Sequence, residues 1–157
     1  MSLTTQGLNR LSISAGIAKL GDRLAALWNQ RQSGGALSQG SPDTTYSIAA
    51  GAYTVDGVVV AGGASANVVL PLTTPDTTGT QYRKLTITID QAGAYALVIG
   101  AVATGSQAAA LKSPAPAGTT EVAYIELPVS FTARTTTITA GMLKQAAAPA
   151  VALGPMP

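Results

Sequence analysis

The stretch KLTITID, residues 84–90, decides the fold class of this 157-residue chain. Three apolar residues, Leu85, Ile87 and Ile89, alternate in it with threonines and an aspartate. Successive side chains of a β-strand point to opposite faces of a sheet, so this period of two predicts a strand. We therefore expect a body that is built from strands.

A hairpin signal lies upstream, in the stretch YTVDGVVV, residues 53–60. Asp56-Gly57 separates two β-prone runs, and a type I′ turn needs a positive φ at both central residues, which this pair tolerates. Such short strands with frequent turn signals predict a mainly β fold. We expect a single antiparallel β-sandwich or jelly-roll-like body over residues 44–145, with an N-terminal α-helical arm. Further strands are expected over residues 68–70, 95–102 and 121–131, the last with Ala123, Ile125 and Leu127 on one face and Val122, Tyr124 and Glu126 on the other.

The N-terminal part of the chain has a different period. Five apolar residues recur at spacings of four and three, which predicts an amphipathic helix with a heptad stripe over residues 13–27. These residues are Ile13, Ile17, Leu20, Leu24 and Leu27. We expect residues 1–31 to form a helical arm, with Trp28 enlarging its contact face. A helix this short is marginal alone in water, so it docks either on its own body or on other chains.

Two segments of biased composition flank the predicted body. Residues 32–43, QSGGALSQGSPD, are rich in Gly and Ser, which predicts a flexible linker between arm and body. Residues 146–157 are an Ala/Pro segment without charged residues, for which we expect an extended tail.

The residue types that are missing bear on catalysis. The chain has no His and no Cys, so neither a Ser-His nor a Cys-His pair can form, and zinc lacks its usual ligands. The seven acidic residues are scattered along the sequence. We interpret Asp56 and Asp90 as turn residues, since calcium needs six to eight oxygen ligands. We therefore expect no enzyme and no catalytic, metal-binding or cofactor-binding residues.

Charge is scarce as well. Charged residues make up 10% of the chain, against about 25% in an average soluble domain. Such a surface favours association with other chains, although a monomer from a GC-rich genome would have a similar composition. The net charge of +2 comes without a basic stripe, so we expect no nucleic-acid partner. No run reaches the ~18 apolar residues of a membrane span, and no signal peptide or membrane partner is expected.

Three stretches of the chain are VAYIELP at residues 122–128, TTTITAG at residues 135–141 and the turn DGVVV at residues 56–60. They resemble segments of tailed-bacteriophage virion proteins of the capsid-decoration and fibre types. A short heptad helix, a Gly/Ser linker and a Thr/Ala/Val-rich body are similar to the organisation of such proteins. The family type has no catalytic residues to carry over.

The resemblance implies a structural virion component that is made in many copies and contacts itself, as a trimer by preference, and the major capsid protein. A cement protein on the capsid surface is favoured, because the chain is short and lacks a fibrous repeat. By binding only the assembled shell, it would stabilise that state. The alternative is a trimeric head- or tail-fibre or adaptor protein with a host-facing β-domain. A carbohydrate-binding or adhesion module is a further alternative, which requires exposed Tyr and Trp side chains in one groove.

Overall fold

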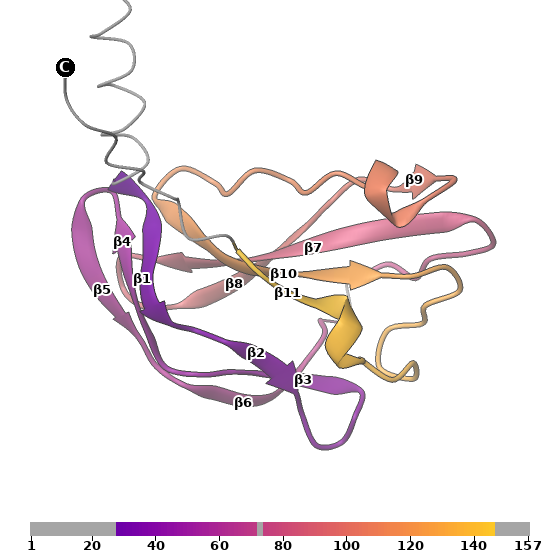
Figure 1. Ribbon diagram of the computed structural model, residues 1–157, viewed down its shortest axis with the longest axis horizontal. Helices are drawn as coiled ribbons and strands as arrows, with labels where there is room; N and C mark the ends of the chain where they lie inside the picture. The colour runs from indigo at the N-terminus through magenta and orange to yellow at the C-terminus, as the bar shows by residue number, and fades with distance from the viewer. Residues whose placement is uncertain (1–27, 72–73, 147–157) are drawn as a thin grey trace, which may run out of the picture.

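A computed structural model describes residues 28–71 and 74–146 of the chain. This part is mainly β, with three antiparallel sheets (Figure 1). The predicted heptad stripe over residues 13–27 lies outside the described residues, as does the predicted tail over residues 146–157 apart from Ala146. The helical arm predicted over residues 1–31 therefore stays a prediction for residues 1–27, whereas Gln30 and Arg31 lie in a strand.

Two of the sheets are built from the same three stretches of chain, each of which forms a strand in one sheet and continues into a strand of the other. We call these two sheets together the bent layer, and the three stretches its chain paths. The first sheet has the order β1 (Gln30–Gly34), β4 (Gly51–Val55), β5 (Val58–Gly62). The second has the order β2 (Leu37–Gln39), β3 (Thr45–Ile48), β6 (Ser65–Val69). Along the chain, β1 leads into β2, β3 into β4 and β5 into β6.

The bend between these sheets falls at matching places in all three paths. The residues between the paired strands are Gly35-Ala36, Ala49-Ala50 and Gly63-Ala64, all of them small. The first two breaks lie side by side, since the Gly35 N–H donates to the Ala50 carbonyl at 3.1 Å and the Ala49 N–H to the Ala36 carbonyl at 2.9 Å. Small side chains let the three strands turn together.

Glycine is required at one of these positions. Gly35 has a φ of +66°, and a Cβ built there would overlap the hydroxyl of Tyr53. Both the left-handed conformation and the close approach of the ring exclude a larger residue.

The structure therefore differs from the predicted flexible linker over residues 32–43. These residues hold the end of β1 and all of β2, and the sheets begin at Gln30 rather than at residue 44. β2 pairs with β3 in the register Leu37 to Ile48, and Leu37 packs against the core. The glycines that suggested flexibility supply the positive φ angles of the bend instead.

The third sheet forms the other layer, which we call the β7 layer. Its order is β11 (Leu143–Gln145), β10 (Thr119–Leu127), β7 (Gln81–Asp90), β8 (Tyr95–Ile99), and the short β9 (Ala103–Thr104) pairs with the start of β7. Two 3₁₀ turns, η1 (Gln107–Ala109) and η2 (Ala140–Met142), lie in its connections. The strand predicted at residues 84–90 is confirmed as the second half of β7.

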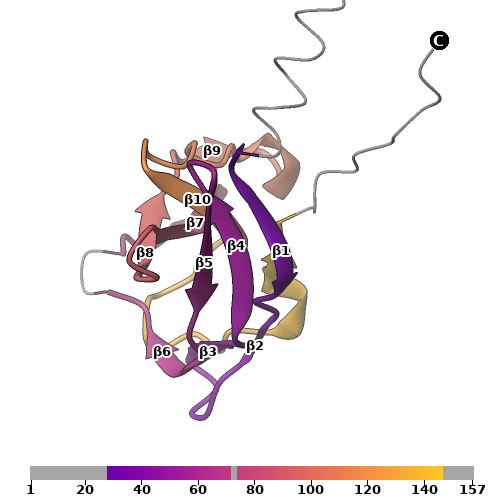
Figure 2. The same cartoon turned by 90° about the vertical axis from the view of Figure 1, so that its left-hand side faces the viewer.

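One hydrophobic core takes side chains from all three sheets, and in Figure 2 the sheet of β1, β4 and β5 faces the viewer with β7 and β10 behind it. The bent layer contributes inward side chains from β3 and β4, and the β7 layer contributes the apolar face of its two long strands. The fully buried side chains include Tyr53, Val55, Leu85, Ile87, Ile89, Val122, Ile125, Leu127, Phe131 and Ile138. Apolar burial of this kind is the main force that holds such layers together.

Strand β10 follows its predicted alternation except at Val122. Ala123, Ile125 and Leu127 are fully buried as expected, but Val122 is fully buried too. The pairing of β10 with β7 shifts register between Glu121 and Ala123, which marks a β-bulge. A bulge inserts one extra residue and so changes the face on which a side chain lies. The prediction that Val122 points away from the core is wrong for this reason.

The predicted hairpin at Asp56-Gly57 is confirmed. Val55 pairs with Val58, so the turn has two residues. Their φ angles are +48° and +79°, as a type I′ turn requires.

Candidate interaction surfaces

The acidic residues singled out in the sequence serve as turn residues. The Asp90 carboxylate accepts hydrogen bonds from the backbone N–H groups of Ala92 and Ala94, both at 2.9 Å. Asp56 Oδ1 accepts one from Asn29 Nδ2 at 3.2 Å. In residues 28–71 and 74–146, no three His, Cys, Asp or Glu side chains gather as a metal site would require.

An exposed apolar surface lies at the tip of the β4–β5 hairpin. It consists of Trp28, Val58 and Val59, which are 55%, 50% and 72% exposed; we call it the end surface. The Trp28 ring lies against Gly57, where a Cβ would stand 3.2 Å from the indole. Three large apolar side chains exposed together are typical of a contact surface.

Hydrogen bonds hold residues 28 and 29 to the β4–β5 turn beside the end surface. The Gly57 N–H donates to the Trp28 carbonyl at 2.9 Å, and the Asp56 N–H donates to Asn29 Oδ1 at 2.6 Å. The Thr120 hydroxyl, on the β7 layer, lies 3.2 Å from the same Asn29 oxygen. Residues 28 and 29 are thus bonded to the β4–β5 turn and lie against the β7 layer. Of the six residues predicted to form an interface, Trp28 lies on this surface and the other five lie outside the described residues.

A groove of about 440 Å³ opens between β6 and β8. Figure 2 shows these two strands on the opposite side of the molecule from β1. Buried Tyr46 and Ile48 lie at its base, and the half-exposed Val69 forms part of one wall. Tyr95 and Leu97 come from β8. No charged residue is among the groove's lining residues, which also include Gly63, Ala64, Ser65, Val68, Pro71, Gly93, Ala94 and Ala96.

Tyrosines connect the two layers beside this groove. The rings of Tyr53 and Tyr95 meet edge to face, with their centroids 6.4 Å apart. Neither buried hydroxyl has a hydrogen-bond partner among the described residues. Burial raises the pKa of Tyr53 well above its ordinary value. Burial raises the pKa of Tyr46 to about 12. Tyr46 and Tyr53 therefore stay neutral near pH 7.

The opposite edge is closed by side-chain hydrogen bonds. Gln145 Nε2 of β11 donates to the Gly35 carbonyl at 2.9 Å and to the Val122 carbonyl at 3.1 Å. The Thr120 hydroxyl of β10 donates to the Thr54 carbonyl at 2.7 Å. These bonds tie the β7 layer to the bent layer along β1, β2 and β4.

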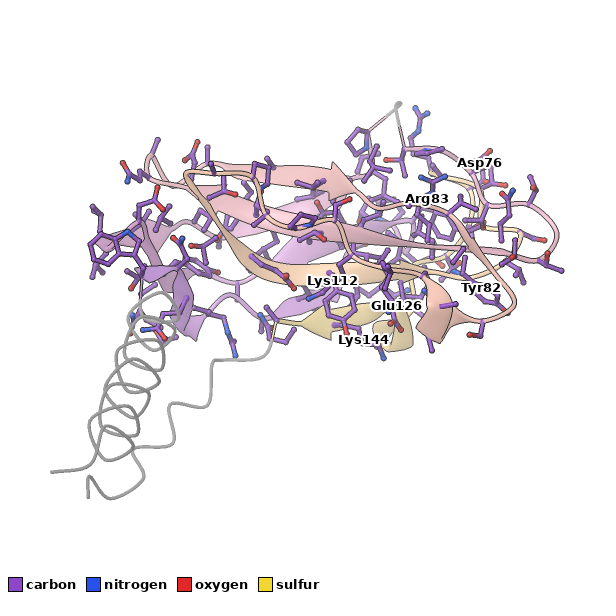
Figure 3. All side chains as sticks on the ribbon, turned by 90° about the horizontal axis from the view of Figure 1, so that it is seen from above. Asp76, Tyr82, Arg83, Lys112, Glu126 and Lys144 are labelled. Carbon is purple, nitrogen blue, oxygen red and sulfur yellow. The ribbon has the colours of Figure 1, made fainter. Side chains whose placement is uncertain are left out.

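A cluster of charges covers the outer face of β10, around Tyr124. Glu126 pairs with Lys84 at 3.5 Å and with Lys144 at 3.9 Å, and Figure 3 shows Glu126, Lys112 and Lys144 on this face. Lys112 pairs with Glu121 and stands 4.7 Å from the centre of the Tyr124 ring. Opposite charges largely neutralise one another here, and partly exposed pairs contribute little to stability. The cluster therefore does not form an anion site.

Comparison with known proteins adds no relative. No protein-family model matches the chain, and neither a curated protein nor a solved structure is significantly similar to it. Within the part of the chain that the structure describes, no helix is long and apolar enough to cross a membrane.

The sequence predicted strands on both sides of the groove but not the groove itself. The run Val68-Val69-Leu70 and the run from Tyr95 are apolar on both faces. An apolar run on both faces is the only local signal that these edge strands have an apolar surface outside the core, such as a groove wall.

Proposed function

We propose that this chain is a non-enzymatic structural protein of a bacteriophage particle, a capsid decoration protein that stabilises the assembled shell through contacts between subunits. The observation that carries the proposal is the exposed end surface of Trp28, Val58 and Val59. It lies where residues 1–27 join the body, directly after the last residue of the heptad stripe, Leu27.

The end surface and the stripe are expected to work together. Both are apolar, and a short amphipathic helix gains most of its stability from packing against other elements. Copies that associate through residues 13–27 bring their end surfaces together, which removes further apolar area from water. A trimer is the favoured form of this assembly.

We further infer that the two layers form a single β-sandwich. One continuous core shared by all three sheets supports this inference, as do the hydrogen bonds of Gln145 and Thr120 that join the layers. A compact sandwich with an apolar end suits a small subunit that sits on a lattice.

A decoration protein acts by mass action. Whatever binds the assembled shell and not its free subunits shifts the equilibrium toward the shell. The low charge of the chain, 10% of its residues, reduces the repulsion between neighbouring copies.

The alternative is a trimeric head- or tail-fibre or adaptor protein, and the fixed junction at Asn29 supports it. A body rigidly joined to its N-terminal segment can project outward from a trimeric base. An adhesion module has less support, because the aromatic side chains are dispersed: Trp28 lies on the end surface, while Tyr46 lies only 5% exposed in the groove.

Copy number separates these possibilities. Particles purified on a density gradient are analysed by mass spectrometry for the ratio of this chain to the major shell protein. A ratio near one, or a simple fraction of one, is expected for a decoration protein. A ratio of a few per cent places the chain at a vertex or tail, and absence from the particles overturns the proposal.

The anchoring role has its own test. Leu20→Asp combined with Leu24→Asp places two charges in the heptad stripe and should abolish both self-association and incorporation into particles. Leu111→Asp is the matched control, because Leu111 is 73% exposed and separate from the end surface. Normal incorporation of the double variant would show that residues 13–27 are not the anchor.

A further inference from the structure

We propose that the groove between β6 and β8 binds the C-terminal segment of a second copy of this chain, residues 147–157, as an added strand. The inference goes beyond the proposed function, because it identifies a second contact between copies that is separate from the end surface. It requires only that copies meet, on a particle or in solution.

The groove offers both apolar surface and free strand edges. Among the described residues, β6 and β8 are each the last strand of their sheet, so each has one edge without a neighbouring strand there. The backbone N–H and C=O groups of such edges are available to an incoming extended segment. Val69, 51% exposed on the groove wall, would lose its contact with water when a segment binds. This combination is the one used in β-strand addition.

The C-terminal segment has the matching chemistry. It contains no charged side chain, like the groove lining. Its central run AVALG, residues 150–154, is free of proline and is bounded by Pro149 and Pro155. Proline cannot donate a ladder hydrogen bond, so strand pairing is confined to this run. The run has five residues, the length of both β6 and β8.

Side-chain alternation within this run selects its orientation. In an extended strand, Val151 and Leu153 lie on one face, while the small Ala150 and Ala152 lie on the other. The larger pair would enter the groove toward Tyr46 and Leu97. The alanines would face outward, where they expose little apolar surface.

The position of the chain after β11 favours a second copy as the donor. The Ala146 N–H donates to the Val122 carbonyl at 3.3 Å, beside β11. β11 and β8 are the two end strands of the β7 layer, so Ala146 lies about 14 Å from β8 in the sheet direction, at roughly 4.8 Å per strand. The four residues from Ala146 to Ala150 span at most about 14 Å when fully extended. A path around the layer is longer than this, so the run at residues 150–154 falls short of its own groove, whereas the groove of a neighbouring copy is not limited in this way.

The absence of native cysteine makes a direct test possible. Full-length chains carrying Val69→Cys are mixed with full-length chains carrying Leu153→Cys and oxidised mildly. The mixed disulfide is identified by mass spectrometry of the joined peptides. Leu111→Cys mixed with Leu153→Cys is the control, because Leu111 is exposed outside the groove.

The disulfide between the cysteines introduced at positions 69 and 153 is expected in a yield at least about tenfold above the control, since a bound segment raises the local concentration of its thiol. Adding Val151→Asp to the Leu153→Cys chain should return the yield to the control level. A yield equal to the control overturns the proposal.

A single chain carrying both cysteines distinguishes the donor. If this double-cysteine chain still forms an internal disulfide when it is diluted, and the two single-cysteine chains form none when mixed, the groove binds the C-terminal segment of its own chain. The proposal of a second copy is then wrong. The measurement uses purified chain without particles. Its outcome is therefore separate from the copy-number test of the proposed function.

Discussion

The two edges of the body are built by different means. Along β1, β2 and β11, hydrogen bonds from Gln145 and Thr120 join the layers. Along β6 and β8, the layers meet through tyrosine rings and apolar side chains, and a groove of about 440 Å³ stays open. Polar side chains that bridge two backbones close an edge in a defined geometry, whereas apolar contacts leave room for an additional segment.

The largest expected effect concerns the bend at the closed edge. Gly35→Ala places a Cβ at a φ of +66° and against the Tyr53 hydroxyl, so it should lower the free energy of unfolding by about 3 kcal/mol or more. Gly63→Ala, at the same bend but on the open edge, has no atom within 4 Å of its Cβ and should change stability by less than about 1 kcal/mol. Urea unfolding of both variants measures the difference. Equal losses would mean that the bend is not held more tightly at one edge.

A second effect, at high pH, concerns the tyrosines of the open edge. The pKa of Tyr46 is raised to about 12 in the folded chain, against about 10 when unfolded. The folded state therefore holds its proton more tightly, and this stability is present below pH 10 and lost as pH rises toward 12. The loss should reach about 3 kcal/mol. Unfolding followed by tryptophan fluorescence from pH 9 to 12 measures it, and Tyr46→Phe should flatten the slope. An unchanged slope in that variant would assign the pH dependence elsewhere.

A third prediction removes a bridge from the closed edge. Gln145→Met keeps the side-chain length but leaves the Gly35 and Val122 carbonyls without this donor. We expect a loss of about 1–2 kcal/mol in the free energy of unfolding. Gln39→Met, on an exposed side chain of β2, is the control and should have little effect. If both variants behave alike, the Gln145 bridge is not what closes the edge.

The smallest effect on stability belongs to the groove wall. Val69→Lys changes a half-exposed side chain and should alter the free energy of unfolding by less than about 0.5 kcal/mol. The same change puts a charge in an uncharged groove. The disulfide test then uses Ala96→Cys as the groove cysteine. A chain that carries both Val69→Lys and Ala96→Cys, mixed with the Leu153→Cys chain, should give no disulfide above background. A strong loss of stability would instead assign Val69 to the core.

The sequence predicted those features that depend on neighbouring residues. The Asp56-Gly57 turn and the strand at residues 84–90 follow from local patterns, and both were confirmed. The alternation did not predict that Thr86 and Thr88 are buried as fully as the apolar residues between them. The bend was misjudged because Gly and Ala at residues 34–36 suit a flexible linker and a tight bend equally well. What decides between them is the pairing with Ala49 and Ala50, which no local pattern shows.

The groove was beyond prediction for a similar reason. It forms where the edges of two different sheets face each other, and β6 and β8 are joined through a long intervening strand, β7. The burial of Val122 depends on a bulge that only the register with β7 defines. The end surface was anticipated in part through Trp28, because a large aromatic residue beside an apolar stripe is visible in sequence.

The fixed junction at Trp28 and Asn29 has a mechanical consequence. A pull on residues 1–27 enters the body at a point already bonded to the β4–β5 turn and adjacent to Thr120 of the β7 layer. The load is then shared among several strands at once. Strand β1 is not peeled from its neighbour one hydrogen bond at a time, so the body should stay folded under tension that would unzip a strand attached by its end alone.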